Sequence, residues 1–450
     1  MGGMGGGTGT TTTNTYPVPW KLIQPPATPK EGLAVYWFPA STTEVTKSSL
    51  LNSRTLSTYA SQCVTLGIVD YHNDIGKKFA SDGKVPVVVL ANPDGTVVGK
   101  LESKDGKLYV SDVEKLVDTE FKKRENSLKE KMEDAKAKAK AGDSKTAIQE
   151  LRAVYDQKCM FPSRAKDAAK ELKKLGVTDV ADVQDGPIYD RVLSAKIERT
   201  MSAGLRAENA AKYSEAERLY ELAHQMDPAD PVPLRYLGEV YRHHLGDWIR
   251  ARQTFNAILR MQADPLSRAV ALHGLGKMTI HEGQFKKGLG LMEQAVAEYP
   301  LALAYRNLAV YWNSEGDNAK ADQLAQQALA LDPNDPYNVV FAAVFRAANG
   351  HTDEALKIAK QYEGLLPASY NLAAIYAQAG QKEKAISLLK RHFYQYERTQ
   401  AVRSKEMMEA RVDTVFASLK TDAAFVSLTS GADGMLDPNR GMGTRSSGTN

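Results

Sequence analysis

The sequence of 450 residues lacks several features that would point to a particular class of protein. It has only two cysteines, Cys63 and Cys159, which are too few for a disulfide framework or for a zinc site with its four ligands. We therefore expect two buried or idle, unpaired thiols. No apolar run reaches the roughly 18 residues that span a bilayer. No signal peptide is recognisable at the start, which predicts a cytoplasmic protein. A Gly/Thr-rich opening also suits an exported chain whose signal peptide lies outside the numbering, and this alternative stays open.

An excess of charge of either sign is also missing. The chain has 58 basic and 54 acidic residues, interspersed, so electrostatics gives no reason to expect a nucleic-acid partner. His243 and His244 are adjacent and diverge by about 100° on a helix, and His273 and His281 have no third ligand at a useful spacing. We therefore expect no metal and no cofactor. Motifs of hydrolases, nucleotide-binding loops and metalloproteases are absent, so we expect no enzyme.

Residues 30–124 alternate short apolar runs with helical stretches, in the order β-α-β-α-β-β-α. The runs at 33–38 and 85–91 have the apolar or β-branched composition of buried strands. Asn-Pro-Asp-Gly at 92–95 is typical of a tight turn and predicts that the next strand pairs back as a hairpin. A helix expected at about 113–123 closes this α/β unit.

The order of these elements, with Val85-Pro86 opening the third strand, resembles the thioredoxin fold. The resemblance implies that the peptide bond before Pro86 is cis and faces a Trp-Cys-x-x-Cys motif. In this chain Ser41 takes the place of the first cysteine and Glu44 that of the second. Because thiol–disulfide exchange needs two sulfur atoms, this degenerate thioredoxin motif predicts no redox reaction. A redox alternative remains, in which Cys63 is the working thiol.

From about residue 126 the strand signals stop and a period near 34 residues appears. It is carried by glycines in the expected turns and by small residues where paired helices must approach closely. This period resembles that of the tetratricopeptide family, over roughly two thirds of the chain. The turn glycines are Gly246, Gly283, Gly316, Gly350 and Gly380.

The sequence thus predicts a multidomain protein, α/β followed by all-α. The thioredoxin-like domain precedes a tetratricopeptide-type α-solenoid, whose stacked hairpins bury one continuous core. The capping helix should carry its charged residues on the outer face: Arg403, Lys405, Glu406, Glu409 and Arg411. The expected segments are a flexible tail at 1–29, the thioredoxin-like domain at 30–124, a degenerate repeat with linker helices at 125–196, six repeats at 197–398, the capping helix at 399–426 and a flexible tail at 427–450.

The tetratricopeptide resemblance implies that the first helix of each hairpin lines a concave groove. Arginine and asparagine there could hold the backbone or a carboxylate of a partner. Asn307 and Asn371 could instead satisfy local backbone groups. The groove residues that the resemblance implies are Arg235, Tyr236, Glu239, Arg242, His243, Arg306, Asn307, Asn313, Tyr370, Asn371 and Gln378.

These observations predict a non-catalytic scaffold that docks a protein or peptide partner in the groove and can also self-assemble as a homo-oligomer. Two alternatives stay open. One is a thiol-redox or redox-chaperone protein that uses Cys63. The other is an exported component of an envelope or surface assembly.

Overall fold

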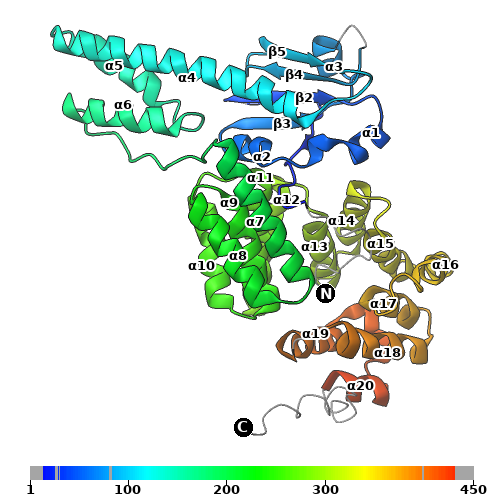
Figure 1. The fold of residues 1–450 in the computed structure, drawn as a ribbon. Helices are drawn as coiled ribbons and strands as arrows, with labels where there is room; N and C mark the ends of the chain where they lie inside the picture. Colours follow the sequence, from blue (N-terminus) through cyan, green and yellow to red (C-terminus); the bar gives the residue numbers. More distant parts are fainter. Residues whose placement is uncertain (1–13, 26–28, 30, 81–83, 398–399, 431–450) are drawn as a thin grey trace, which may run out of the picture. The chain divides into compact units, whose positions relative to one another are not determined.

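The computed structural model describes residues 14–25, 29, 31–80, 84–397 and 400–430 (Figure 1). The chain divides into two compact units. The sheet unit comprises the described residues of Thr12–Gly238 and Arg252–Ala271. The groove unit comprises those of Glu239–Ala251 and Leu272–Asn450.

A five-stranded sheet in the order β1-β3-β2-β4-β5 forms the centre of the sheet unit. Strands β2 and β3 run parallel, and β4 runs antiparallel to both β2 and β5. Every residue of β2 and β4 is buried, as their apolar composition predicts. The strands are β1 (Lys21–Leu22), β2 (Leu33–Phe38), β3 (Val64–Ile68), β4 (Val87–Ala91) and β5 (Val97–Glu102).

Successive residues of β2 contribute to two different cores, because side chains alternate across a strand. Val35 and Trp37 pack with residues of α2 and α4, whereas Tyr36 packs with α3, where its ring stacks on Phe79 at 5.3 Å. The helices around the sheet are α1 (Thr42–Lys47), the 3-10 turn η1 (Ser49–Leu51), α2 (Arg54–Ala60), α3 (Asp74–Phe79) and α4 (Val110–Lys140).

Helix α4 does not end near residue 123 as expected, but continues to Lys140. Residues 124–140 contain no glycine or proline and consist mostly of good helix formers, so nothing in that stretch interrupts the helix. Gly142, with a φ of +92°, follows the end of the helix. Three further helical segments complete this region before the repeats: α5 (Ser144–Tyr155), α6 (Pro162–Lys174) and the start of α7 (Arg191–Asn209).

The flexible tail predicted at 1–29 is wrong for residues 14–25, which are part of the sheet unit. Trp20 is buried, its indole nitrogen donates a hydrogen bond to Leu50 O at 2.7 Å, and its ring meets Trp37 edge-on. The overall Gly/Thr/Pro composition concealed these aromatic anchors. Residues 1–13 lie outside the described residues.

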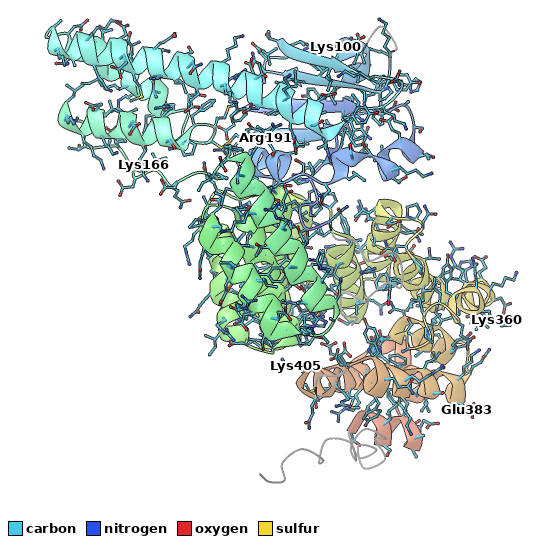
Figure 2. The ribbon with its side chains drawn as sticks, viewed as in Figure 1. Lys100, Lys166, Arg191, Lys360, Glu383 and Lys405 are labelled. Atoms are coloured by element: carbon cyan, nitrogen blue, oxygen red, sulfur yellow. A yellow bond between two sulfur atoms is a disulfide. The ribbon has the colours of Figure 1, made fainter. Side chains whose placement is uncertain are left out.

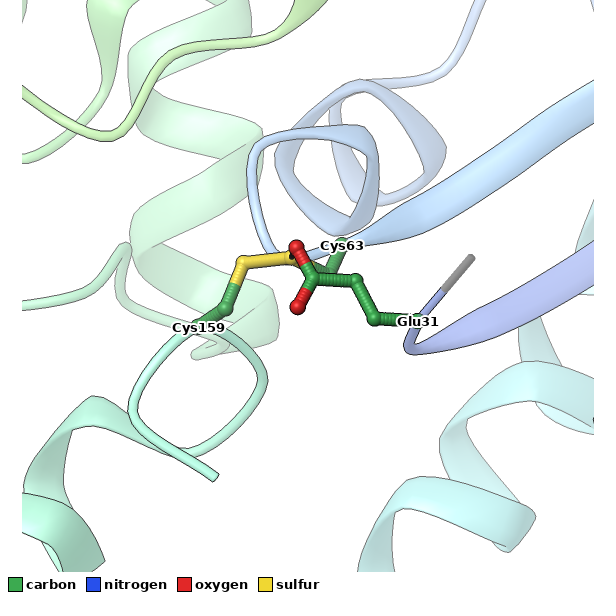
Figure 3. Close-up of a disulfide and its surroundings, with 3 residues drawn as sticks. All are labelled: Glu31, Cys63 and Cys159. Carbon is green, nitrogen blue, oxygen red and sulfur yellow. Dashed lines mark hydrogen bonds between the residues drawn. A yellow bond between two sulfur atoms is a disulfide. The ribbon is translucent and has the colours of Figure 1, made fainter. Parts of the chain in front are cut away.

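The expectation of two unpaired thiols is also wrong. Cys63 and Cys159 form a disulfide, with Cα atoms 5.8 Å apart (Figure 3). Glu31 Oε1 lies 3.6 Å from Cys63 Sγ, a contact only, because the bonded sulfur has no hydrogen to donate. The sequence did not indicate this pair because the two cysteines are 96 residues apart. Helices α4 and α5 lie between them, and the chain returns to the sheet after α5.

Six consecutive helical hairpins follow, α7–α8 to α17–α18, and all five predicted turn glycines have positive φ values. At the third hairpin, a Cβ on Gly276 would come within 2.9 Å of Gly288 O, so the small residues permit the close approach. Helices α9, α10 and α11 each have residues in both units. The hairpin elements are α8 (Tyr213–Met226), α9 (Pro231–Glu239), the π turn η2 (Val240–His244), α10 (Trp248–Arg260), α11 (Pro265–His281), α12 (Phe285–Glu298), α13 (Ala302–Ser314), α14 (Asn318–Leu331), α15 (Pro336–Ala348), α16 (Thr352–Tyr362), α17 (Tyr370–Gln378) and α18 (Lys382–Arg391).

The C-terminal part differs from the single capping helix expected at 399–426. It consists of the π turn η3 (His392–Tyr396), α19 (Gln400–Val412), the 3-10 helix η4 (Thr414–Leu419) and α20 (Ala423–Ser430). Phe416 and Phe425 are buried in the core of the last hairpins, so η4 and α20 close its end. The tail predicted from residue 427 is helical as far as Ser430, and residues 431–450 lie outside the described residues.

Candidate protein-binding groove

Three successive first helices, α13, α15 and α17, line a pocket of about 630 Å³, measured with its open mouth, in the groove unit. Five of the predicted groove residues line it: Arg306, Asn307, Asn313, Tyr370 and Asn371. They meet because equivalent positions of successive repeats fall on one surface. The remaining lining residues are Leu303, Val310, Tyr337, Phe341, Val344, Phe345, Ala374, Asp413 and Val415.

Internal contacts hold the polar side chains on the floor of this pocket. Arg306 donates to Asn338 Oδ1 at 2.8 Å and lies 3.5 Å from Asp335 Oδ2. Asn307 Nδ2 lies 2.7 Å from His273 Nε2, so Asn307 contacts a side chain rather than the local backbone. Burial lowers the pKa of His273 to about 3, and the neutral ring can accept this hydrogen bond.

The chain's own C-terminal segment contributes to the rim of the pocket. The hydroxyl of Tyr370 donates to Asp413 Oδ2 at 3.1 Å, and Asn313 Nδ2 donates to Thr414 Oγ1 at 2.7 Å. Asn371 is half-buried and lines the same pocket. The turn after α19 therefore already contacts two of the predicted groove residues.

The expectation that the charged residues of α19 lie on its outer face is wrong for Glu406 and Glu409. Glu406 is buried 3.0 Å from His392 Nε2, and Glu409 lies 3.0 Å from His281 Nε2. Lys405, labelled in Figure 2, lies 3.4 Å from the centre of the Trp248 ring.

Of the other charged residues on α19, Arg403 stands over the Tyr394 ring at 5.1 Å, and Arg411 is exposed as predicted. A sequence signal for the inward face existed. Glu406 and Glu409 recur at the spacing of one helix face, for which the sequence analysis predicts an outer position.

Four further predicted groove residues of the groove unit do not line this pocket. Glu239 and Arg242 form an ion pair at 2.6 Å, one helical turn apart. Burial raises the pKa of Glu239, but the Arg242 guanidinium outweighs this and lowers it overall. Burial lowers the pKa of His243 to about 3. Gln378 donates to the backbone oxygens of Val344 and Ala374, both at 3.2 Å.

The two remaining predicted groove residues belong to the sheet unit. Arg235 is buried, and its guanidinium lies 5.4 Å from the centre of the Tyr236 ring. The Tyr236 ring in turn lies 5.1 Å from that of Tyr220. The Tyr236 ring therefore packs against the preceding hairpin, and about half of the predicted groove set lines the pocket.

The degenerate thioredoxin motif has a local structural role. Ser41 Oγ accepts a hydrogen bond from the Glu44 backbone at 3.2 Å, and Glu44 Oε2 accepts one from the Ala40 backbone at 2.7 Å. Both side chains therefore cap the start of α1. Pro86 is buried and follows a cis peptide bond, as the resemblance implies. Cys63 is bonded to Cys159 and carries no free thiol in this structure, and the redox alternative stays a prediction.

The described residues contain no group of three or more histidine, cysteine, aspartate or glutamate side chains that could hold a metal ion. None of their helices has the length and apolar content of a membrane-spanning segment.

No family model matches this chain. It is 31% identical over 129 residues to the Protein CTR9 homolog of Arabidopsis thaliana, a stretch that covers 28% of this chain and 12% of that relative. The chain thus matches only a small part of the length of this relative.

Solved structures of repeat proteins resemble part of the chain. A thermophilic TPR protein of Thermus thermophilus matches 41% of this chain and 99% of its own, at 22% identity and a TM-score of 0.33. The TPR protein YrrB, described as having an unusual peptide-binding site, matches 42% of this chain and 97% of its own, at 18% identity and a TM-score of 0.28. The hairpins and their spacing form a tetratricopeptide-like α-solenoid.

Proposed function

We propose that this chain is a non-catalytic scaffold that docks a segment of another protein in the pocket between α13, α15 and α17. The observation that carries the proposal is the composition of this pocket. Apolar side chains such as Phe341 and Val310 form much of its wall, and Asn371 offers an amide at its edge. Peptide-binding surfaces combine such apolar contacts with a few oriented polar groups.

Site-specific photo-crosslinking in the native cell tests this proposal. A benzoylphenylalanine residue would replace Asn371 or Leu303 in the pocket or, as a control, the exposed Lys360 on α16. We expect one and the same protein to be captured from both pocket positions and not from Lys360. Capture of the same set of proteins from all three positions, or of none from the pocket, would contradict docking at this site.

We further propose that residues 30–124 form a thioredoxin-like domain used for docking rather than for catalysis. The support is the β3-β2-β4-β5 strand order with one parallel and two antiparallel pairs, together with the capping roles of Ser41 and Glu44. Self-assembly through either unit remains part of the proposal. Light scattering over a tenfold range of concentration would test it, and a constant monomer mass would rule it out.

The disulfide favours the exported alternative over the cytoplasmic location predicted from the sequence, because disulfides persist mainly in oxidising compartments. We therefore propose that the chain folds outside the reducing cytoplasm. Thiol labelling of the protein in freshly lysed native cells under denaturing conditions would test this. Two labelled cysteines would contradict the proposal, and none would support it.

A further inference from the structure

The groove unit already holds an occupant on the surface proposed for docking. Helix α19 and the turn after it, residues 400–415, contact side chains from four preceding helices. Glu409 contacts His281 of α11, Lys405 contacts Trp248 of α10, Thr414 contacts Asn313 of α13 and Asp413 contacts Tyr370 of α17. This segment, which we call the occupant segment, lines the pocket at Asp413 and Val415 and also contacts the start of α10 and the end of α11.

Acidic side chains dominate the inward face of the occupant segment, and basic groups of the repeats face them. Burial lowers the pKa of Lys277 on α11, and the charges of Glu409 and Glu406 oppose that shift. His281, on the same helix, contacts Glu409 directly. Two carboxylates on one face of α19, those of Glu406 and Glu409, thus face basic groups, whereas Asp413, beyond the end of the helix, accepts from the Tyr370 hydroxyl.

The match between the occupant segment and the groove is imperfect at one position. Lys405 approaches the same basic surface: burial lowers its pKa, Glu409 opposes this shift, and the charges of Arg242 and Lys277 lower it further. The Trp248 ring accommodates the lysine, but a residue without positive charge would avoid the repulsion. A helix from another protein, with the same acidic face and no such lysine, would fit the surface better.

The occupant segment exposes apolar side chains on its outer face and buries few of them on its inner face. On its outer face Met408 and Val412 are 53% and 70% exposed, and among its described side chains the buried apolar ones are Met407 and Ala410. The following η4 and α20 bury the rings of Phe416 and Phe425 in the same end core as Met407 and Ala410. Release of α19 would break the contacts of these two residues, whereas Phe416 and Phe425 also pack with residues of α17 and α18.

We propose that residues 400–415 are a displaceable internal occupant of the groove, and that the external partner is an acidic amphipathic helix that competes with them. The inference rests on the proposed docking function and specifies its partner and its regulation. It predicts that weakening the internal contacts increases the affinity of the groove for such a helix, because the apparent affinity falls with the fraction of open groove.

The test uses three full-length proteins and two synthetic peptides. The proteins are the wild type, the double variant Glu406→Gln/Glu409→Gln, and the control Glu383→Gln, which changes an exposed glutamate on α18 (Figure 2). The first peptide has the sequence of residues 400–415, and the second carries glutamine or asparagine at its positions 406, 409 and 413. Fluorescence anisotropy measures their binding.

We expect the acidic peptide to bind the double variant at least about tenfold more tightly than the wild type or the control, and the neutral peptide to bind all three weakly. Hydrogen exchange of residues 403–412 provides a second measurement, and these amides should exchange faster in the double variant alone. If exchange accelerates without a gain in affinity, the segment is not a competitor. Equal binding of the two peptides would exclude acidic recognition.

Failure of this inference can be distinguished from failure of the docking function. Specific crosslinking at Asn371 in the wild type, without any gain in peptide affinity in the double variant, would retain docking and reject the internal occupant. A gain in peptide affinity without a native partner at Asn371 would support the internal occupant and reject docking of an external protein. A variant that failed to fold would lose the far-ultraviolet signal of its helices. The single variant Glu409→Gln, which weakens the contact with His281, then takes its place, and an affinity equal to that of the wild type would reject the inference.

Discussion

The two ends of the described chain both fold back onto their own unit, but they do so by different means. At the N-terminal end, the Tyr16 hydroxyl donates to Asp230 at 2.8 Å, and both side chains are buried. At the C-terminal end, the equivalent bond from Tyr370 reaches Asp413 at 3.1 Å, on a half-buried aspartate beside an open pocket. The same pair of chemical groups thus lies in a fully buried network at one end and beside a pocket at the other.

The largest effect is expected from breaking the buried network at the N-terminal end. Arg54 is 1% exposed, and it binds Asp227 and Asp230 as well as Ser194 Oγ. Arg54→Ala would leave two buried carboxylates without their cation, a loss of about 3–5 kcal/mol in the free energy of unfolding. Urea denaturation of the full chain measures this loss. The exposed Arg191→Ala is the control, and a loss below about 1 kcal/mol in R54A would contradict the role of the network.

A slightly smaller effect is expected from opening the disulfide, which stabilises the sheet unit alone. The double variant Cys63→Ser/Cys159→Ser would lose about 2–4 kcal/mol, because the bond closes a loop across a separation of 96 residues. Urea denaturation with and without dithiothreitol is the measurement. Reductant should lower the stability of the wild type to that of the variant and leave the variant unchanged. If the wild type does not respond to complete reduction, the bond contributes nothing.

Acid should act on the groove unit through its buried histidines. His273 is buried and neutral, and burial lowers its pKa from 6.5 to about 3. The unfolded chain therefore binds a proton that the folded chain does not, so the stability present above pH 6.5 is lost as the pH falls towards 3. The maximal slope is about 1.4 kcal/mol per pH unit for each such group. His273→Gln should reduce the slope of denaturation midpoints between pH 7 and 4, and an unchanged slope would assign the acid sensitivity to other groups.

The repeat architecture could be predicted from the sequence because its signals are local and repeated. Turn glycines such as Gly283 and Gly350 are needed for the positive φ of their own residue, which is a local property. Small residues such as Gly276 recur in each repeat, where the two helices of a hairpin approach closely. The strands at 33–38 and 85–91 could be predicted equally well, since a short, fully apolar run is typical of a buried strand. About half of the predicted groove residues converge for the same reason: repeat register transfers from one hairpin to the next.

The features that the sequence did not reveal depend on pairs of residues far apart in the chain. Nothing local connects Cys63 with Cys159, or Tyr16 with Asp230, which are separated by 214 positions. The inward face of α19 depends on groups such as His281, more than 100 positions earlier, so a charged helix in isolation was interpreted as solvated. Likewise, the Gly/Thr/Pro-rich composition of the N-terminal segment gave no indication that Trp20 is buried and anchors it.

The smallest and most direct test compares the two ends with one substitution, tyrosine to phenylalanine. Tyr16→Phe removes a donor to a carboxylate that is fully buried, where no water can replace it, so we expect a loss of about 1.5–3 kcal/mol. Tyr370→Phe removes the same donor from an aspartate that water can reach, so we expect a loss of only about 0.5–1 kcal/mol.

Urea denaturation measures both losses in the free energy of unfolding, and hydrogen exchange then shows which amides lose protection in each variant. In the Tyr16→Phe variant, exchange should accelerate throughout the sheet unit, because a buried network opens only when its surroundings do. In the Tyr370→Phe variant, acceleration should be confined to the turn at residues 413–415. Equal losses at the two tyrosines, or exchange that spreads through the groove unit after Tyr370→Phe, would mean that the C-terminal segment is as firmly fixed as the N-terminal one. In that case the C-terminal segment could not be displaced, and the groove could not open to a partner by displacing it.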